Sequence, residues 1–372
     1  MIPIPAESYN IVWLIFITIL CIFHTNYLSR YHTFEQLYAR NNNGILAARW
    51  LLYITVIYFG LRPISAVFAD MLGYAETYES GVYMVSEIRN EPVWTIIMIV
   101  CHYGLGLSTH LWFLVVAAIG LGCRYFASNK ILGNHIYTAL LFLCTSFSFT
   151  SGMTNIIRSN TAMGFALAGI ALFLQDTKKQ KLIALLFFFL AFYGHTSTAL
   201  LIGCFFISKY FIKRIDWCIY IYVACIALSL VMGTYFEAFF SSLGFDDRML
   251  QFTTDTDYSG FAHAGFRWDF LAYSIVPILL GWYILKKREI KNVIYSNLLN
   301  TYILANAFWV LVIRAQFSDR FAAISWTMYF IALAYPLLKV KVWNNQPRKV
   351  IYGLWFQVGF LWFMELYYSF IR

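Results

Sequence analysis

Four arginines of the sequence lie close to the ends of long apolar runs, where a charge is costly and usually has a partner or a function. They are Arg62 in YFGLRPIS, Arg158 in NIIRSN, Arg267 in GFRWDF and Arg320 in FSDRFAAISW. A guanidinium group binds phosphate through two parallel hydrogen bonds and stays charged. Each could instead pair with a local carboxylate, as Arg267 with Asp269, or extend to water. Because the predicted topology places all four on one face, we expect a shared diphosphate ligand, with Arg62 the weakest candidate.

His195 in the segment FYGHTSTA is the first candidate for a general base. A neutral imidazole accepts a proton near neutral pH, which suits the activation of a hydroxyl group. Asp70, Asp269 and Glu91 are the carboxylates that could serve in its place. A histidine bonded to a neighbouring backbone carbonyl would explain the same residue without catalysis, so both interpretations stay open.

The polar segments 69–91 and 240–268 combine carboxylates, arginines and aromatic residues. Aromatic rings stack on pyranose faces and carboxylates bind hydroxyl groups, so this mixture suits a sugar phosphate. We predict that Glu91, Tyr74 and Tyr258 bind sugar and that the two segments form part of the substrate site. A surface that only interacts with water is the alternative.

The sequence does not favour a metal or a cofactor. The Asp-x-Asp pair of TDTDY (residues 254–258) can hold a divalent metal on a nucleotide diphosphate, but nucleotide sugars are cytoplasmic and this loop is predicted to be outside. No P-loop is present, and no GxGxxG motif occurs in a strand–turn–helix context. The seven cysteines lack CxxC or CxxH spacing, which indicates small core residues. We predict no metal, no cofactor and no nucleic-acid partner.

The composition determines the class of protein. Of 372 residues, 61% are hydrophobic, 20% are aromatic and only 12% are charged, which excludes an ordinary soluble globular protein. Apolar runs of about 20 residues recur between short polar segments, as in a polytopic membrane protein. We therefore predict an all-α fold and one integral membrane domain over residues 1–372.

The apolar runs give twelve predicted membrane spans. Segment 92–108 is shorter than a comfortable span and is predicted to be a re-entrant or interfacial helix. The spans are 11–29, 45–67, 109–126, 131–150, 155–175, 181–194, 196–212, 216–239, 269–285, 294–313, 320–338 and 350–370.

The basic residues give these spans an orientation. With twelve spans, every lysine lies on one side, which the positive-inside rule identifies as the cytoplasm. The segment CRYFASNK, with Arg124 and Lys130, belongs to that side, whereas the opposite side holds only arginines among its basic residues. The arginines on the outer side are therefore not needed to orient the spans, which favours a role for them in ligand binding.

Two cytoplasmic basic clusters enclose only residues 181–212, so two short helices must meet near FYGHTSTA. Gly194 and Thr196 allow this break, which is tolerated at membrane depth only beside a polar cavity or within protein. His195 would face the outer cavity from the turn. The span that begins near Asn155 also directs its free backbone amides outward, where they would add to the anion site.

Several segments together resemble the Wzy and EpsG family of polysaccharide polymerases. NIIRSNTAMGFALAGIALF is followed by FYGHTSTAL, and FSDRFAAISWTMYFIALAYPLL comes near the end. GFRWDFLAYSIVPILLGWY and NLLNTYILANAFWVLVI fit the same order, so the resemblance covers about residues 45–340. The family's Gly-Thr-Asp-Tyr signature is replaced here by AVFADMLGY, which contains Asp70.

The resemblance implies a GT-C-like glycosyltransferase of the bacterial inner membrane with its active site facing the periplasm. Such an enzyme transfers a growing O-antigen type glycan from undecaprenyl diphosphate to the non-reducing end of a new lipid-linked repeat unit. It is expected to be inverting and metal-independent, and its partners would be membrane lipid and a chain-length regulator protein. An O-antigen ligase and a flippase or transporter for lipid-linked oligosaccharide are the alternatives.

The orientation can be tested by cysteine labelling from outside the cell. Single cysteines at positions 130 and 287, in a chain otherwise free of cysteine, are expected not to react with an impermeant reagent because both positions lie on the cytoplasmic side. Labelling of either position before the membrane is permeabilised would overturn the predicted topology.

Overall fold

The structure, a computed structural model, describes residues 4–39, 43–83, 85–242, 265–315 and 318–371. Helices connected by short turns account for its regular structure, and no β-strand occurs among these residues. This confirms the predicted all-helical architecture. The seven cysteines are all unpaired and buried or partly buried, as expected for small core residues.

The chain forms two compact units. The first comprises residues 1–198 and 333–372, and the second comprises residues 199–332. The helices of unit 1 are α1 (Tyr9–Leu28), α2 (Phe34–Ala39), α3 (Asn43–Gly60), α4 (Met71–Ser80), α5 (Val85–Asn90), α6 (Pro92–Ile99), the π-helix η3 (Val100–Gly104), α7 (Thr109–Leu132), α8 (Ile136–Cys144), α9 (Phe149–Thr154), α10 (Ile157–Phe173), α11 (Lys178–Gly194) and α19 (Gln346–Ile371).

The helices of unit 2 are α12 (Thr198–Tyr210), α13 (Ile215–Ser242), α15 (Trp268–Trp282), the π-helix η5 (Tyr283–Lys287), α16 (Val293–Leu311) and α17 (Ser318–Trp326). The unit boundary at residues 332 and 333 falls within α18 (Tyr329–Lys339). The expectation of a single integral domain stays a prediction.

Within the part of the chain that the structure describes, six helical segments are long and apolar enough to cross a membrane. They are Ala6–Leu28, Thr109–Cys144, Ile215–Met232, Trp268–Lys287, Ser318–Lys339 and Gln346–Phe370. Shorter apolar helices, Gly44–Gly60, Ile157–Phe173 and Thr198–Tyr210, coincide with other predicted spans. The structure therefore supports a membrane protein, and the count of twelve stays a prediction.

The path of α7 differs from the sequence-based expectation. We predicted that one span ends at residue 126 and that CRYFASNK lies in a cytoplasmic connection. Instead α7 continues through this segment to Leu132 and ends where Gly133 adopts a positive φ of 58°. Arg124 is only 3% exposed, whereas Lys130 is exposed. The whole segment is therefore helical, and Arg124 is an internal residue.

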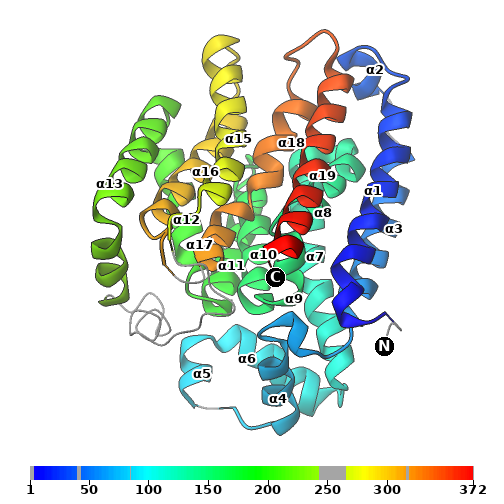
Figure 1. Ribbon diagram of the computed structural model, residues 1–372, viewed down its shortest axis with the longest axis vertical. Helices are drawn as coiled ribbons and strands as arrows, with labels where there is room; N and C mark the ends of the chain where they lie inside the picture. Colours follow the sequence, from blue (N-terminus) through cyan, green and yellow to red (C-terminus); the bar gives the residue numbers. More distant parts are fainter. Residues whose placement is uncertain (1–3, 40–42, 84, 243–264, 316–317, 372) are drawn as a thin grey trace. The chain divides into compact units, whose positions relative to one another are not determined.

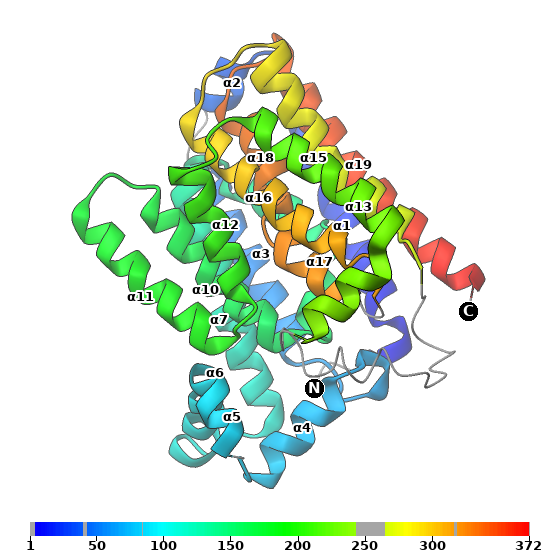
Figure 2. The same ribbon diagram turned by 90° about the vertical axis from the view of Figure 1, so that its left-hand side faces the viewer.

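Segment 92–104 is a short apolar element, as predicted. The eight residues of α6 and the five of η3 cover only about 20 Å as a helix, less than the roughly 30 Å of a bilayer core. Figures 1 and 2 show α4, α5 and α6 together at the end of unit 1 where α7 begins. A re-entrant or interfacial position for this segment remains a prediction.

Aromatic packing attaches this group of short helices to α7. The Tyr78 ring stacks on Trp112 with 4.6 Å between centroids, and Trp94 meets Trp112 edge-on at 5.7 Å. The Tyr78 hydroxyl donates a hydrogen bond of 2.9 Å to the Leu107 carbonyl. Burial raises the pKa of Tyr78 to about 12, so the hydroxyl keeps its proton and continues to donate at neutral pH.

The predicted break at FYGHTSTA is confirmed. Helix α11 ends at Gly194, His195 is extended with φ −166° and ψ 121°, and α12 begins at Thr198. The His195 carbonyl accepts hydrogen bonds from the Thr198 backbone N–H at 3.1 Å and from its hydroxyl at 2.9 Å. These bonds fix the turn on which His195 lies.

Helices α7 and α10 approach closely through glycines. A Cβ atom added to Gly164 would lie 2.9 Å from the Gly120 carbonyl oxygen and 3.1 Å from Arg124 Nη1. Both distances are shorter than an ordinary contact, so only glycine fits at position 164 without moving the backbone of α7.

A Gly164→Val substitution is therefore expected to cost about 1–3 kcal/mol and to lower the thermal unfolding temperature of the purified protein. Gly122→Ala is the matched control, because a Cβ atom there meets nothing within 4 Å. Equal unfolding temperatures for the two variants would contradict the close packing of α7 on α10.

Candidate functional site

Glu91 brings together two of the predicted site residues. Its Oε2 atom lies 2.8 Å from Arg158 Nη1, and its Oε1 atom pairs with His195 Nδ1. The side chains are 13% exposed at Glu91, 28% at Arg158 and 23% at His195, so the cluster is largely but not fully enclosed. The Glu91 carboxylate thus holds His195, the candidate base, beside Arg158, a candidate for binding the diphosphate. We call these three residues the Glu91 cluster.

Three helix ends of unit 1 form the Glu91 cluster. Glu91 precedes Pro92, the first residue of α6, where a proline starts a helix without losing a hydrogen bond. Arg158 lies in the first turn of α10, and His195 follows the last residue of α11. A Cβ atom at Gly194 would lie 3.3 Å from the Ala162 Cβ atom, so the glycine lets α11 approach α10.

The Glu91 contact determines which nitrogen of His195 is available. An ionised carboxylate only accepts hydrogen bonds, so Nδ1 must carry the proton in this pair. In a neutral imidazole Nε2 then presents its lone pair, and no partner for Nε2 occurs within the described residues. A histidine held by a carboxylate at Nδ1 and free at Nε2 has the arrangement of a general base.

Arg158 retains capacity for a ligand. Its contact with Glu91 uses only Nη1, and the other N–H groups of its guanidinium have no partner within the described residues. No side chain caps the first amides of α10, because the residue before the helix is Ile156. A partly exposed guanidinium beside an uncapped helix N-terminus favours binding of an anion.

The other predicted residues of unit 1 lie outside the Glu91 cluster. Asp70 occupies the position before α4 and is partly exposed. Tyr74 is partly exposed and meets Trp94 edge-on at 5.8 Å. The predicted roles of Asp70 as a base and of Tyr74 in sugar binding stay predictions. Glu91, predicted to bind sugar, has both carboxylate oxygens occupied by protein groups.

Unit 2 contains a second charged group. Arg267 makes two parallel hydrogen bonds to Asp269, at 2.9 and 2.6 Å, and its Cζ atom lies 3.5 Å from the centre of the Phe270 ring. The carboxylate of Asp319 interacts electrostatically with both Arg320 and Arg267. Local pairing of Arg267 with Asp269 is therefore observed. The convergence of Arg267 and Arg320 with Arg158 stays a prediction.

Arg62 is buried, with only 1% of its surface exposed. It donates hydrogen bonds to the backbone carbonyls of Phe59 and, at 3.3 Å, of Thr154. Its Cζ atom lies 4.8 Å from the centre of the Phe113 ring. No contact joins it to the Glu91 cluster within the described residues, so its predicted role in diphosphate binding gains no support.

The structural role of Arg124 was not predicted from the sequence. Its Nη2 atom donates to the backbone carbonyl of Asn160 at 2.8 Å and to Asn160 Oδ1 at 2.6 Å, and Nη1 donates to the Gly120 carbonyl at 3.1 Å. Arg124 therefore supports the first turn of α10, next to Arg158. The sequence is apolar on both sides of Arg124, and this pattern could have indicated that the helix continues through it.

Two remaining predictions concern Tyr258 and a metal. Tyr258 and most of segment 240–268 lie outside the described residues. Among the residues that the structure describes, no group of three or more His, Cys, Asp or Glu side chains could hold a metal ion.

Comparison with known proteins identifies one match. The EpsG family matches residues 45–371, which is most of the chain. No curated protein and no solved structure matches the chain.

The contact between Glu91 and Arg158 can be measured by a double-mutant cycle. Glu91→Gln and Arg158→Gln are expected to be non-additive in thermal unfolding, with a coupling of about 1 kcal/mol, because the pair is partly enclosed. Glu76→Gln combined with Arg158→Gln is the control, since Glu76 is exposed on α4. Additive effects of Glu91→Gln and Arg158→Gln would show that this pair does not form.

Proposed function

The chain belongs to the EpsG family of polysaccharide polymerase-like membrane proteins, and we propose that it polymerises an O-antigen type polysaccharide. In this proposal a growing glycan moves from undecaprenyl diphosphate to the non-reducing end of a new lipid-linked repeat unit. The Glu91 cluster carries the proposal, because the Glu91 carboxylate holds the candidate base His195 beside Arg158, a cation that can bind the diphosphate. Membership of the family implies a glycosyltransferase-like polymerase.

The proposed reaction is a single displacement at the anomeric carbon of the donor sugar. The acceptor hydroxyl oxygen forms the new glycosidic bond while the bond between the anomeric carbon and the diphosphate oxygen breaks. His195 Nε2 takes the hydroxyl proton, and Glu91 holds the imidazolium that forms. The diphosphate leaves with the bonding electrons, and the configuration at the anomeric carbon inverts.

Charge develops on the leaving diphosphate, and preorganised donors stabilise it. Arg158 is the first of these donors, supported by the uncapped amides of α10. We propose that Arg267 and Arg320 bind the same diphosphate. In this proposal Asp269 orients Arg267 through their paired hydrogen bonds, instead of acting as the base.

We propose that this site faces the periplasm, in a GT-C-like arrangement of about twelve membrane-spanning helices in the bacterial inner membrane. The supporting observation is the distribution of lysine and arginine. Every lysine lies on one predicted side, and the basic residues of the other side are all arginines. A chain-length regulator protein is the expected partner. An O-antigen ligase would use the same donor with a different acceptor, and a flippase would need no base.

Four variants test the proposal in cells that produce the polysaccharide. Arg158→Ala, His195→Ala, Arg267→Ala and Arg320→Ala are each expected to lower polymerisation by roughly 100-fold or more, because each removes a base or a charge-stabilising donor. The measurements are the chain-length ladder and the amount of lipid-linked single repeat unit, which should accumulate.

Arg30→Ala is the control, since Arg30 is an exposed arginine that follows the predicted span 11–29 on the cytoplasmic side. It should leave the ladder unchanged, and all variants should insert into the membrane at normal levels. Normal ladders in the Arg158 and His195 variants would refute the proposed roles. Loss of ligation to lipid A core with an intact lipid-linked ladder would indicate a ligase.

A further inference from the structure

Unit 1 buries two guanidinium groups without a carboxylate partner. Arg62 is 1% exposed and Arg124 is 3% exposed. Their recorded hydrogen bonds reach backbone carbonyls and one amide oxygen, and no acidic side chain contacts either within the described residues. The Phe113 ring compensates part of the Arg62 charge. A buried charge that lacks a counter-charge typically costs several kcal/mol, so two such residues in one region require an explanation.

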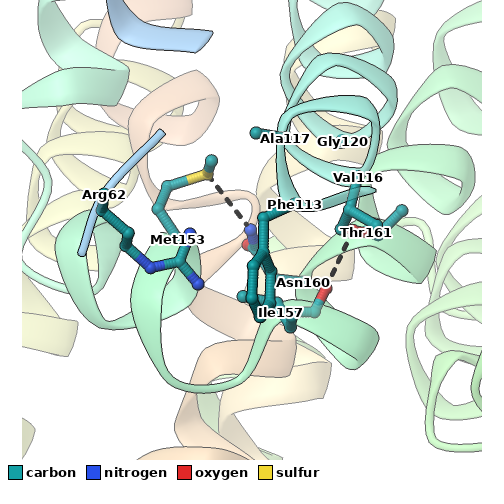
Figure 3. Close-up of a pocket in the computed structure, with 9 residues that line it drawn as sticks. All are labelled: Arg62, Phe113, Val116, Ala117, Gly120, Met153, Ile157, Asn160 and Thr161. Carbon is teal, nitrogen blue, oxygen red and sulfur yellow. Dashed lines mark hydrogen bonds between the residues drawn. The ribbon is translucent and has the colours of Figure 1, made fainter. Parts of the chain in front are cut away.

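A small pocket lies beside these two residues, and Arg62, Phe113, Gly120, Met153, Asn160 and Thr161 form most of its wall. Figure 3 shows the Arg62 guanidinium and the side chains of Phe113, Met153 and Asn160 facing one another. The space at its centre holds about one particle the size of a water molecule. Arg124 lies across the wall, because its Nη1 atom is 3.6 Å from a Cβ atom added at Gly120.

The wall of this pocket offers more donors than acceptors. Arg62 Nε has no hydrogen-bond partner among the residues that the structure describes. Asn160 Nδ2 donates only to the thioether sulfur of Met153, at 3.4 Å, and sulfur is a weak acceptor. The Asn160 carbonyl oxygen is already occupied by Arg124. The first turn of α10, which has no side-chain cap, also lines the pocket through Ile157 and Asn160.

We propose that this pocket binds a small inorganic anion of halide size, for which chloride is the abundant candidate. An anion supplies the missing acceptor and also the missing negative charge, whereas a water molecule supplies only the acceptor. The size of the pocket excludes a phosphate unless the wall moves. The bound anion would compensate Arg62 and Arg124 and stabilise the junction of α9 and α10.

This site differs from the proposed diphosphate site. Arg62 is too buried to meet a lipid headgroup, whereas Arg158 is partly exposed. The proposal about the pocket does not depend on glycan transfer, because its test needs no substrate.

The test uses the full-length protein in nanodiscs, with chloride replaced by gluconate at constant ionic strength. Increasing chloride should raise the thermal unfolding temperature in a saturable manner, by a few degrees, and bromide should act similarly. Chloride NMR should show line broadening that the protein causes at the same concentrations. Substitution of Glu91 by Gln should keep this response, which separates the two sites.

Two variants should abolish the chloride response. Arg62→Gln removes the cation that lacks a counter-charge. Gly120→Ala adds a methyl group to the pocket wall at ordinary contact distances of 3.4 and 3.6 Å from Thr161 Oγ1 and Arg124 Nη1. Gly120→Ala retains both arginines, so it remains informative if Arg62→Gln fails to fold. Gly122→Ala, on the same helix with open space around its Cβ position, should respond like the unmodified protein.

Three outcomes would overturn the proposal. The unfolding temperature could be the same in chloride and gluconate, which would mean that the pocket holds only water. A response to phosphate without a response to chloride would contradict the inferred size. An unchanged chloride response in Gly120→Ala would place the anion elsewhere.

Discussion

The carboxylate of Glu91 is the group on which the geometry of the candidate site depends. Its two oxygens each bind a different positively charged or protonatable side chain, and each of those side chains comes from a different helix end. Removing the partner of a fully buried charge costs about 3–5 kcal/mol, and the cost is smaller for this partly exposed cluster. The three helix ends are therefore energetically linked. Shifting α6, α10 or α11 would leave at least one of these charges without its partner.

Buried residues of unit 1 stabilise the helix end that carries Arg158. The corner between α9 and α10 receives one arginine on each side, Arg62 at the Thr154 carbonyl and Arg124 at Asn160. Arg158 lies between these two positions in the sequence but points to a partly exposed site. The same corner therefore combines internal arginines that hold the backbone with one arginine that can meet a ligand. Close packing at Gly164 leaves room for the Arg124 side chain between α7 and α10.

The amino-acid sequence predicts the helices better than it predicts their contacts. Apolar runs and polar interruptions located the long apolar helices but not the short helices α2, α4 and α5, and Gly194 with the residues after it located the break at His195. The pairing of Glu91 with His195 could not be predicted, because the residues are 104 positions apart and hydropathy carries no information about which helix ends meet. Arg124 was misplaced for a related reason. Its charge suggested a position at the membrane surface, whereas the hydrogen bonds that it donates to Asn160 and Gly120 compensate it inside the unit.

The most direct test of the central claim is polymerisation by the purified protein in proteoliposomes. The substrate is a synthetic undecaprenyl-diphosphate repeat unit, no nucleotide is added, and chain length is measured on a gel. We expect a ladder of products with release of undecaprenyl diphosphate, and almost none of either when Glu91 is replaced by Gln. An unmodified single repeat unit, or a full ladder from the Glu91→Gln protein, would contradict it.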